Sequence, residues 1–332
     1  MNRLRRDLVG AAAWAAILPQ ALAAQPARMP RVLWAAPRGP QDSIRKVFSA
    51  RGLEDGRNVR LVFETVRRMA QRPEIEANAR RFVAGQPDVI VIVGEAAELF
   101  EIQRLTRTIP VVFANLNIDP QLVGLVESAR RPGGNLTGTF SPWDVLVTKH
   151  LGLLLEVKPS MRLVGRLQIK EALEETSAGE AGWVRIWRLQ EESVRNAAAA
   201  SKVELREIVL PGSISAASMA RAVRDSRVEG LLVEFAMTKG VFEYLRSCPL
   251  PACMYSPESA RAGALMAVFD DWDEGLEQAV RMVVRILRGE SPASMPVYQV
   301  TKYGIAVNLR TARANGIVIP PSVLVQATEV IE

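Results

Sequence analysis

The sequence predicts an α/β fold of two lobes, each built on a parallel β-sheet. The chain has 332 residues, enough for two domains of ordinary size. Apolar residues make up 48% and charged residues 23%, which is typical of a globular protein. Short apolar runs of about four to eight residues alternate with amphipathic stretches. Because this βαβ pattern begins again after Gly138, it indicates two doubly wound sheets in succession.

The first lobe is expected to contain four strands and three helices. The clearest strand is "DVIVIV", since every residue after Asp88 is β-branched and a strand buried on both faces forms a continuous apolar run. Strands are expected at residues 31–36, 59–66, 88–93 and 109–116, and helices at 43–51, 72–85 and 96–105.

The second half repeats this alternation and ends in a mixed tail. Its clearest helix covers residues 274–288, with Asp271 or Asp273 as N-cap. Further helices are expected at 145–157, 183–200 and 215–224, with a short one ending near Cys248. Strands are expected at 162–169, 203–210, 230–237, 250–256 and 264–269; two short extended pieces around 297–307, a Pro320-Pro321 turn and a final helix follow.

Residues 1–23 predict an export signal. Arg3, Arg5 and Arg6 form a basic start, and the apolar run that follows is too short to span a bilayer as a mature helix. The "ALA" at 21–23 predicts cleavage after Ala23 or Ala24. Arg5-Arg6 also fits part of a twin-arginine pattern, and an uncleaved anchor is the alternative. In either case we expect the folded part in the periplasm.

The residue types present do not predict catalysis or metal binding. His150 is the single histidine, about a hundred residues from Cys248 and Cys253, too few ligands for a zinc site. We expect His150 in a surface or packing role. No nucleophile elbow or P-loop motif occurs, so no catalytic residue, metal or cofactor is expected. The two cysteines form either a small-loop disulfide or a pair of free, partly buried thiols.

The charge distribution favours solvated helix faces over a nucleic-acid site. Lys and Arg total 42 and Asp and Glu 36, a formal charge of +6. Pairs such as Arg67-Arg68 and Arg80-Arg81 are short and lack interleaved aromatic residues. We therefore expect no nucleic-acid partner.

The segment "RRPGGNLTG" at residues 130–138 lies close to the join of the two lobes. It does not match the dinucleotide-binding fingerprint, so a phosphate site is not expected there. Asn135-Leu136-Thr137 is a glycosylation sequon, but the leader looks bacterial and a glycan is not expected.

Several longer segments carry a family resemblance. They are "GLEDGRNV", "DVIVIVG", "IPVVFANLNIDP", "GLVESARRPGGNLTG", "ILRGESPASMPV" and, most specifically, "VNLRTARANGIVIPPSVLVQATEVIE". Taken in order, they resemble the periplasmic solute-binding proteins of ABC transporters described as tryptophan/tyrosine-type. The resemblance implies a type I periplasmic-binding-protein fold, in which two Rossmann-like lobes are joined by a crossing-strand hinge and close on a small molecule. It also implies a permease partner in the inner membrane.

The resemblance implies lobe boundaries, a hinge and a ligand site. The first lobe is expected at residues 30–138 plus about 264–292, and the second at 139–263 plus about 296–332. Hinge residues are expected at Gly133, Gly134, Gly138 and Ser141, where glycines allow a tight turn. The implied ligand-binding residues are Pro37, Arg38, Glu95, Ala96, Ala97, Asn115, Asn117, Asp119, Phe140, Met237 and Tyr255.

Some of these positions depart from the family pattern, which leaves the ligand open. The family usually has Thr-Pro where this chain has Glu95-Ala96, so Glu95 either meets a ligand ammonium or caps the next helix. The usual Tyr-Gly of the return strand is Val268-Phe269. The leading function is the solute-binding component of an importer, an amino acid being one candidate ligand. The alternatives are a sensor for a membrane receptor and an α/β enzyme.

Overall fold

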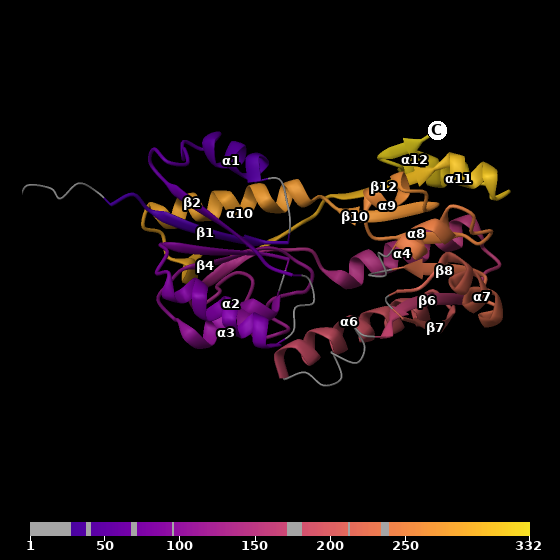
Figure 1. Ribbon diagram of the computed structural model, residues 1–332, viewed down its shortest axis with the longest axis horizontal. Coiled ribbons are helices and arrows are strands. Elements are labelled where there is room, and N and C mark those ends of the chain that lie inside the picture. The colour runs from indigo at the N-terminus through magenta and orange to yellow at the C-terminus, as the bar shows by residue number, and fades with distance from the viewer. Residues whose placement is uncertain are drawn as a thin grey trace, which may run out of the picture.

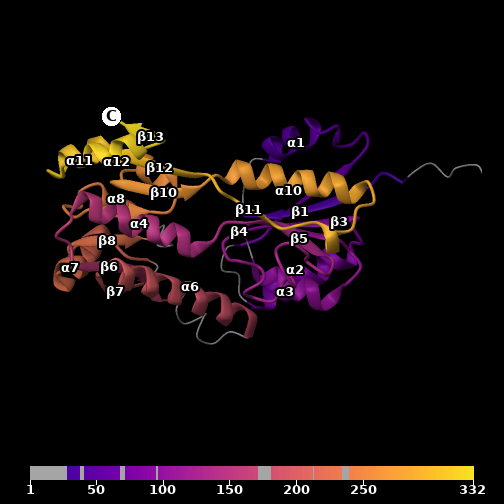
Figure 2. The ribbon, with the colours of Figure 1, turned by 180° about the vertical axis from the view of Figure 1, so that it is seen from behind.

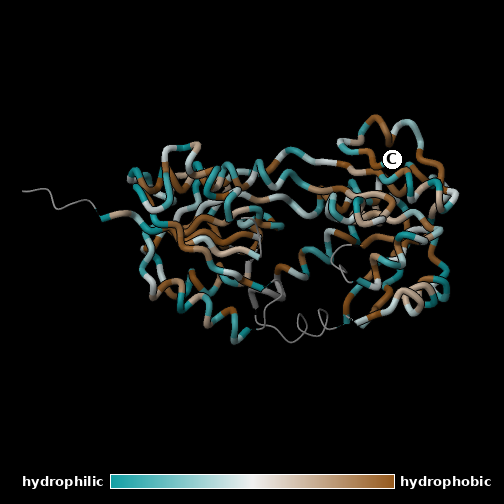
Figure 3. The backbone as a smooth tube through the Cα atoms, turned by 45° about the horizontal axis from the view of Figure 1, so that its top comes forward, coloured by the Kyte–Doolittle hydropathy of each residue, from teal (hydrophilic) through white to brown (hydrophobic). Residues whose placement is uncertain are grey.

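Figure 1 shows the computed structural model, in which two α/β lobes lie side by side. The structure describes residues 28–37, 41–67, 72–94, 96–170, 181–211, 213–233 and 239–332. The expected export signal therefore lies outside the described residues. In each lobe, apolar strands run through the interior and polar segments lie outside, as the hydropathy colouring of Figure 3 shows. Each lobe thus has its own core, as the repeated βαβ pattern predicts.

The first sheet is wholly parallel and has helices on both faces. Its strand order is β11-β5-β4-β3-β1-β2. Helices α1 and α10 cover one face, and α2 and α3 cover the other (Figure 1). The bounds are β1 Arg31–Ala36, α1 Gln41–Ser49, β2 Arg60–Thr65, α2 Arg72–Ala84, β3 Val89–Val93, α3 Ala96–Leu105, β4 Val111–Leu116, β5 Leu136–Phe140, α10 Trp272–Leu287 and β11 Tyr298–Gln299.

The second sheet follows the order β13-β12-β10-β9-β8-β6-β7. Only the pair β10–β12 is antiparallel. Helices α4, α6 and α12 pack on one face, and α7 and α8 on the other. The bounds are α4 Trp143–Val157, β6 Leu163–Ile169, α6 Ala181–Ala200, β7 Glu204–Leu210, α7 Ala216–Ser226, β8 Gly230–Val233, α8 Lys239–Leu245, β9 Ala252–Met254, α9 Pro257–Arg261, β10 Met266–Asp270, β12 Tyr303–Asn308, α11 Leu309–Ala314, α12 Pro321–Gln326 and β13 Glu329–Ile331.

The chain crosses between the lobes three times. It leaves the first sheet after β5 and enters α4, returns from β10 into α10, and leaves again from β11 into β12. In Figure 2, the long helix α10 lies over the first sheet and β11 lies beside β5. The crossings are therefore short segments around Ser141, Asp271 and Thr301.

Sheet membership differs from the expected lobe boundaries at two strands. The strand β10 lies within residues 264–292, which we expected in the first lobe, but it pairs with β9 and β12 of the second sheet. Conversely, β11 lies within residues 296–332, expected in the second lobe, but pairs with β5. The reason is that the crossings fall after β10 and after β11, so each strand completes the sheet that the chain is about to leave.

Local chemistry sets several element ends. The side chain of Asp271 accepts a hydrogen bond from the Glu274 amide at 3.0 Å, so Asp271 rather than Asp273 caps α10. Gly133 has a φ of 82°, in the left-handed region that favours glycine, and turns the chain before β5. Strand β13 is too short for its pattern to be distinguished in the sequence.

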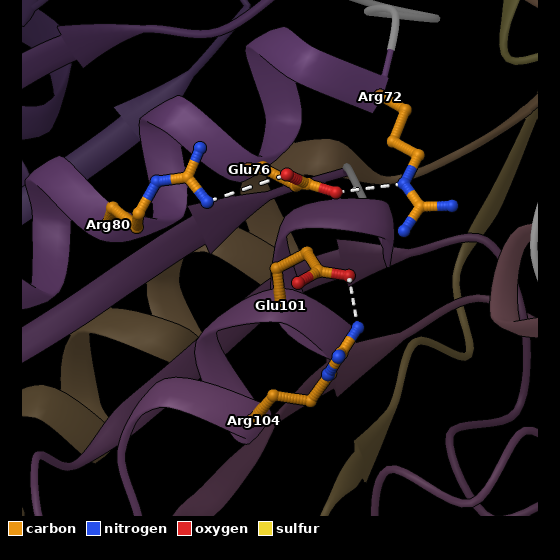
Figure 4. A network of polar contacts seen from close by, with 5 residues as sticks. All are labelled: Arg72, Glu76, Arg80, Glu101 and Arg104. Atoms are coloured by element: carbon orange, nitrogen blue, oxygen red, sulfur yellow. Dashed lines mark hydrogen bonds and ion pairs between the residues drawn. The ribbon is translucent and has the colours of Figure 1, made fainter.

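Of the basic pairs noted in the sequence, Arg80-Arg81 lies on α2, where Glu76 and Glu64 pair with it, and Arg67 follows β2 and pairs with Glu74. Arg72 and Arg80 both pair with Glu76 on α2, and Arg104 pairs with Glu101 on α3 (Figure 4). These arginines are half or more exposed, so each pair stabilises the fold by only about 0.2–1 kcal/mol. This face is therefore mixed in charge.

Candidate functional site

The predicted first-lobe site residues gather at one edge of the first sheet. Because β1, β3 and β4 are adjacent and parallel, their carboxyl ends meet at the same edge. Pro37 follows β1, Ala97 lies in the first turn of α3, and Asn117 and Asp119 follow β4. Pro37, Asn117 and Asp119 are partly exposed. This edge therefore offers a set of accessible backbone and side-chain groups beside the crossings.

Three of the expected site residues are outside the described part of the chain. They are Arg38, Glu95 and Met237. Ala96 begins α3 directly after Glu95. Whether Glu95 meets a ligand or caps α3 stays a prediction.

Asn115 holds the second crossing in place. Its φ of 52° is left-handed, and its Nδ2 donates to the Trp272 carbonyl at 2.9 Å. Its backbone N–H donates to the Thr139 hydroxyl at 2.9 Å, which in turn donates to the Gly275 carbonyl. A side chain at Gly275 would collide with Asn115 Oδ1. These contacts hold the start of α10 against β4 and β5. Asn115 therefore anchors this helix.

Two further expected ligand residues have structural roles. The Asp119 carboxylate accepts a hydrogen bond from the Gln121 amide at 2.8 Å and closes a turn on itself. Phe140 is 4% exposed and belongs to the first-lobe core, and β5 is buried along its whole length, so this side chain packs inward. Its expected ligand contact stays a prediction.

The residues that the sequence predicted as a hinge differ in whether they lie on a crossing between the lobes. Gly138 lies inside β5, where a Cβ atom would be 2.0 Å from the Phe113 carbonyl oxygen. Gly134 has open space around it. Ser141 is the first residue after β5, is 1% exposed, and donates its backbone N–H to the Leu116 carbonyl. Ser141 is therefore the residue of this set that lies on a crossing.

The second lobe contributes an aromatic and acidic group beside the crossings. Tyr255 follows β9, is partly exposed, and lies with its ring 5.3 Å from that of Trp143 at the start of α4. The Tyr255 hydroxyl donates to Asp270 Oδ1 at 3.2 Å. Asp270 ends β10, is 3% exposed, and stands opposite Tyr303 in the β10–β12 register. Burial raises the pKa of the Asp270 carboxyl, while the hydroxyls of Tyr255 and Ser141 lower it.

Of this group, the sequence analysis selected Tyr255 as an expected ligand-binding residue, but not Asp270, Trp143 or Tyr303. The signal for Asp270 was present, because it is a carboxylate that directly follows the apolar strand "ALMAVF". The family resemblance had selected the residues after β1, β3 and β4, but not the residue after "ALMAVF". Trp143 and Tyr303 gave no such signal, since an aromatic residue at the start of an element is equally typical of a core.

The histidine and the two cysteines are buried in the second lobe. His150 is 1% exposed, and its Nε2 lies 2.8 Å from the Met254 carbonyl oxygen. Burial lowers the pKa of His150 to about 4, so the ring is neutral at physiological pH. Cys248 and Cys253 are free and buried, and burial raises both thiol pKa values. In the described part of the chain, no cluster of three His, Cys, Asp or Glu side chains suits a metal.

Comparison with known proteins agrees with this architecture. A structure from Streptococcus pneumonia, described as an ABC domain in complex with L-Trp, superposes with a TM-score of 0.73 at 21% identity, covering 91% of this chain and 99% of that chain. A conserved domain protein from Vibrio cholerae gives a TM-score of 0.71 at 22% identity, covering 91% and 100%. Two doubly wound lobes with three crossings define a protein of the type I periplasmic-binding class.

The family follows from the sequence itself. The model of the ABC transporter substrate-binding protein family matches residues 39–331, so the chain belongs to that family. A tyrosine-binding protein of Clostridioides difficile is 23% identical over 278 residues, which cover 81% of this chain and 74% of that protein. The chain is thus a solute-binding protein of the kind that serves importers. Of the helices in the described ranges, none combines the length and apolar character that spanning a bilayer requires.

Proposed function

We propose that this protein captures an amino acid outside the cytoplasm and delivers it to an ABC permease in the inner membrane. The family match over residues 39–331 carries this proposal. Support for the ligand class comes from relatives, since one is described as tyrosine-binding and one structural neighbour holds L-Trp. The N-terminal segment with its "ALA" motif supplies export to the periplasm.

The proposed ligand site lies between the two lobes, where the carboxyl ends of the strands meet. On the first lobe it takes the segments after β1, β3 and β4, including Pro37, Ala97 and Asn117. On the second lobe it takes Tyr255, which follows β9. Ligands of α/β proteins bind outside the carboxyl ends of strands, because loops and helix N-termini converge there. The role is capture, with no chemical step.

A thermal-shift screen of the mature protein, residues 24–332, tests this function. L-Tyrosine and L-tryptophan are the first probes, followed by the other amino acids and by sugars. A ligand that binds only the folded state, at a hundredfold excess over its Kd, stabilises that state by about 2.7 kcal/mol. We expect a rise of several degrees with an aromatic amino acid. A shift with sugars alone would contradict the ligand class but keep solute binding, whereas no shift with any solute would contradict both.

A further inference from the structure

Asp270 is a buried carboxylate that has no cationic partner among the described residues. It is 3% exposed and ends β10 at the second crossing. None of the ion pairs in the described part of the chain includes it, whereas several surface acids, such as Glu64, Glu277 and Glu329, are paired with arginine. A buried, uncompensated carboxylate costs several kcal/mol. Its position therefore calls for a compensating group.

The groups around Asp270 are hydroxyls and aromatic rings. Tyr255 donates to Oδ1 at 3.2 Å, the Ser141 hydroxyl lies beside the carboxyl, and Tyr303 stands opposite in the sheet. Lys149 is the cation associated with this group, but its ammonium lies 5.2 Å from the centre of the Tyr303 ring and forms no ion pair with Asp270. Neutral hydroxyls stabilise a carboxylate only in part, so the site still lacks a positive charge.

The position of Asp270 places it where a ligand can supply that charge. Ser141, Asp270 and Tyr303 lie on or beside the three different crossings, and Tyr255 ends the neighbouring strand β9. This is the carboxyl-end edge of the second sheet, which faces the first lobe at the crossings (Figure 1). Tyr255 is partly exposed there, so a solute that contacts its ring comes within reach of the acid that its hydroxyl contacts.

We propose that Asp270 selects ligands that carry an ammonium group, with its carboxylate as the ammonium's partner and the Tyr255 ring alongside. This inference rests on the proposed function, and it identifies Asp270 as the residue that recognises the amino group of the ligand. It is a separate prediction from the one for Glu95, which we expected in the first lobe. A charged hydrogen bond of this kind corresponds to a preference of roughly 10- to 150-fold over a ligand that lacks the amino group.

The test compares two ligands that differ only in the amino group. Calorimetry of the mature protein measures the affinity for L-tyrosine and for 3-(4-hydroxyphenyl)propanoate, and in parallel for L-tryptophan and indole-3-propanoate. We expect the wild-type protein to prefer the amino acid by at least about tenfold. Asp270→Asn keeps the shape and the contact with Tyr255 but removes the charge. It is expected to weaken amino-acid binding by at least about tenfold and to leave the deamino analogue within about twofold.

One matched variant separates this role from a general charge effect. Asp144→Asn removes an exposed acid from the first turn of α4 and is expected to keep the preference for the amino acid. If Asp270→Asn weakens the binding of the amino acid and of its deamino analogue equally, the residue has a purely structural role and the proposal is overturned. A variant that keeps the wild-type preference for the amino acid would also overturn it. A wild-type protein that binds only solutes without an amino group would also overturn it, while leaving solute binding intact.

Discussion

At the scale of single residues, the polar side chains beside the crossings divide into those that hold the backbone and those left for a ligand. Asp119 closes its own turn and Asn115 anchors α10, whereas Asp270 has hydroxyl neighbours and no described cation. The sequence could place all three at strand ends, because strands and their ends follow from apolar runs. It could not predict their orientation, since a side chain at a strand end can turn toward its own backbone, toward the core or outward. Phe140 shows this plainly.

His150 is expected to make folding stability depend on pH. Its folded-state pKa is about 4, below the ordinary value of 6.5. Between these values the unfolded chain binds a proton that the folded chain does not, so the free energy of unfolding decreases as the pH falls through this window. The difference corresponds to about 3 kcal/mol. Urea titrations of wild type and His150→Gln between pH 7 and about 4 measure it.

The wild-type protein is expected to lose more stability across that window than the variant, because carboxylates affect both proteins alike and cancel in the comparison. Since the chain has one histidine, the difference reports His150 alone. Parallel curves for the two proteins would contradict the buried neutral ring.

The two glycines of "PGGNLTG" that differ most in their surroundings offer a matched pair. Gly138→Ala places a methyl group against the Phe113 carbonyl, and we expect a loss of about 1–3 kcal/mol in the free energy of unfolding. Gly134→Ala has open space and an ordinary backbone, so a change within about 0.5 kcal/mol is expected. Thermal melts of both variants decide this, and equal melting points would refute the close approach of β5 to β4.

At the scale of elements, helix α6 is fixed to β6 by a buried ion pair. Arg166 Nη1 lies 2.6 Å from Glu191 Oε2, and the two side chains are 4% and 8% exposed. The exposed Glu207 lies 3.5 Å from the same guanidinium. Towards its N-terminus, α6 places Ile186 in the first-lobe core beside α3. Helix α6 therefore contacts both lobes. Its Glu191 pairs with Arg166 of the second lobe, and its Ile186 packs in the core of the first.

Removing one partner of the Arg166–Glu191 pair is expected to lower the free energy of unfolding more than replacing both partners with apolar residues. Arg166→Met leaves Glu191 buried and uncompensated, and we expect a loss of about 3–5 kcal/mol. The double variant Arg166→Met/Glu191→Leu removes both charges and is expected to recover most of it. Denaturant unfolding of the two variants measures the difference. A double variant as unstable as the single one would show that the pair itself, not the orphaned charge, is what stabilises the fold.

The sequence predicted the longer helices and most strands well, because periodicity and apolar runs are local properties, but it did not predict the short helices α9 and α11. It predicted sheet membership less well, since pairing partners can lie far apart along the chain. Strand β10 pairs with β12 across the whole of α10, and β11 pairs with β5 from more than a hundred residues away. No local pattern shows which sheet such a strand joins.

At the scale of the whole molecule, two lobes joined by three short crossings are expected to move as a hinged pair. Small-angle scattering of the mature protein with and without a saturating ligand from the thermal screen measures this. We expect a smaller radius of gyration in the bound state, because the ligand bridges the two lobes. An unchanged profile at saturation would contradict closure, though not binding.

The interleaved order of the lobes also determines when the protein can fold as it is made. Residues 28–140 emerge from the ribosome early, yet the helix that covers one face of their sheet, Trp272–Leu287, is among the last segments synthesised. Until then Val32, Trp34 and Val91 lack their α10 neighbours. A polypeptide whose first lobe is completed only near the end of translation stays uncompacted for longer. Such a delay is compatible with export of the chain in an unfolded state.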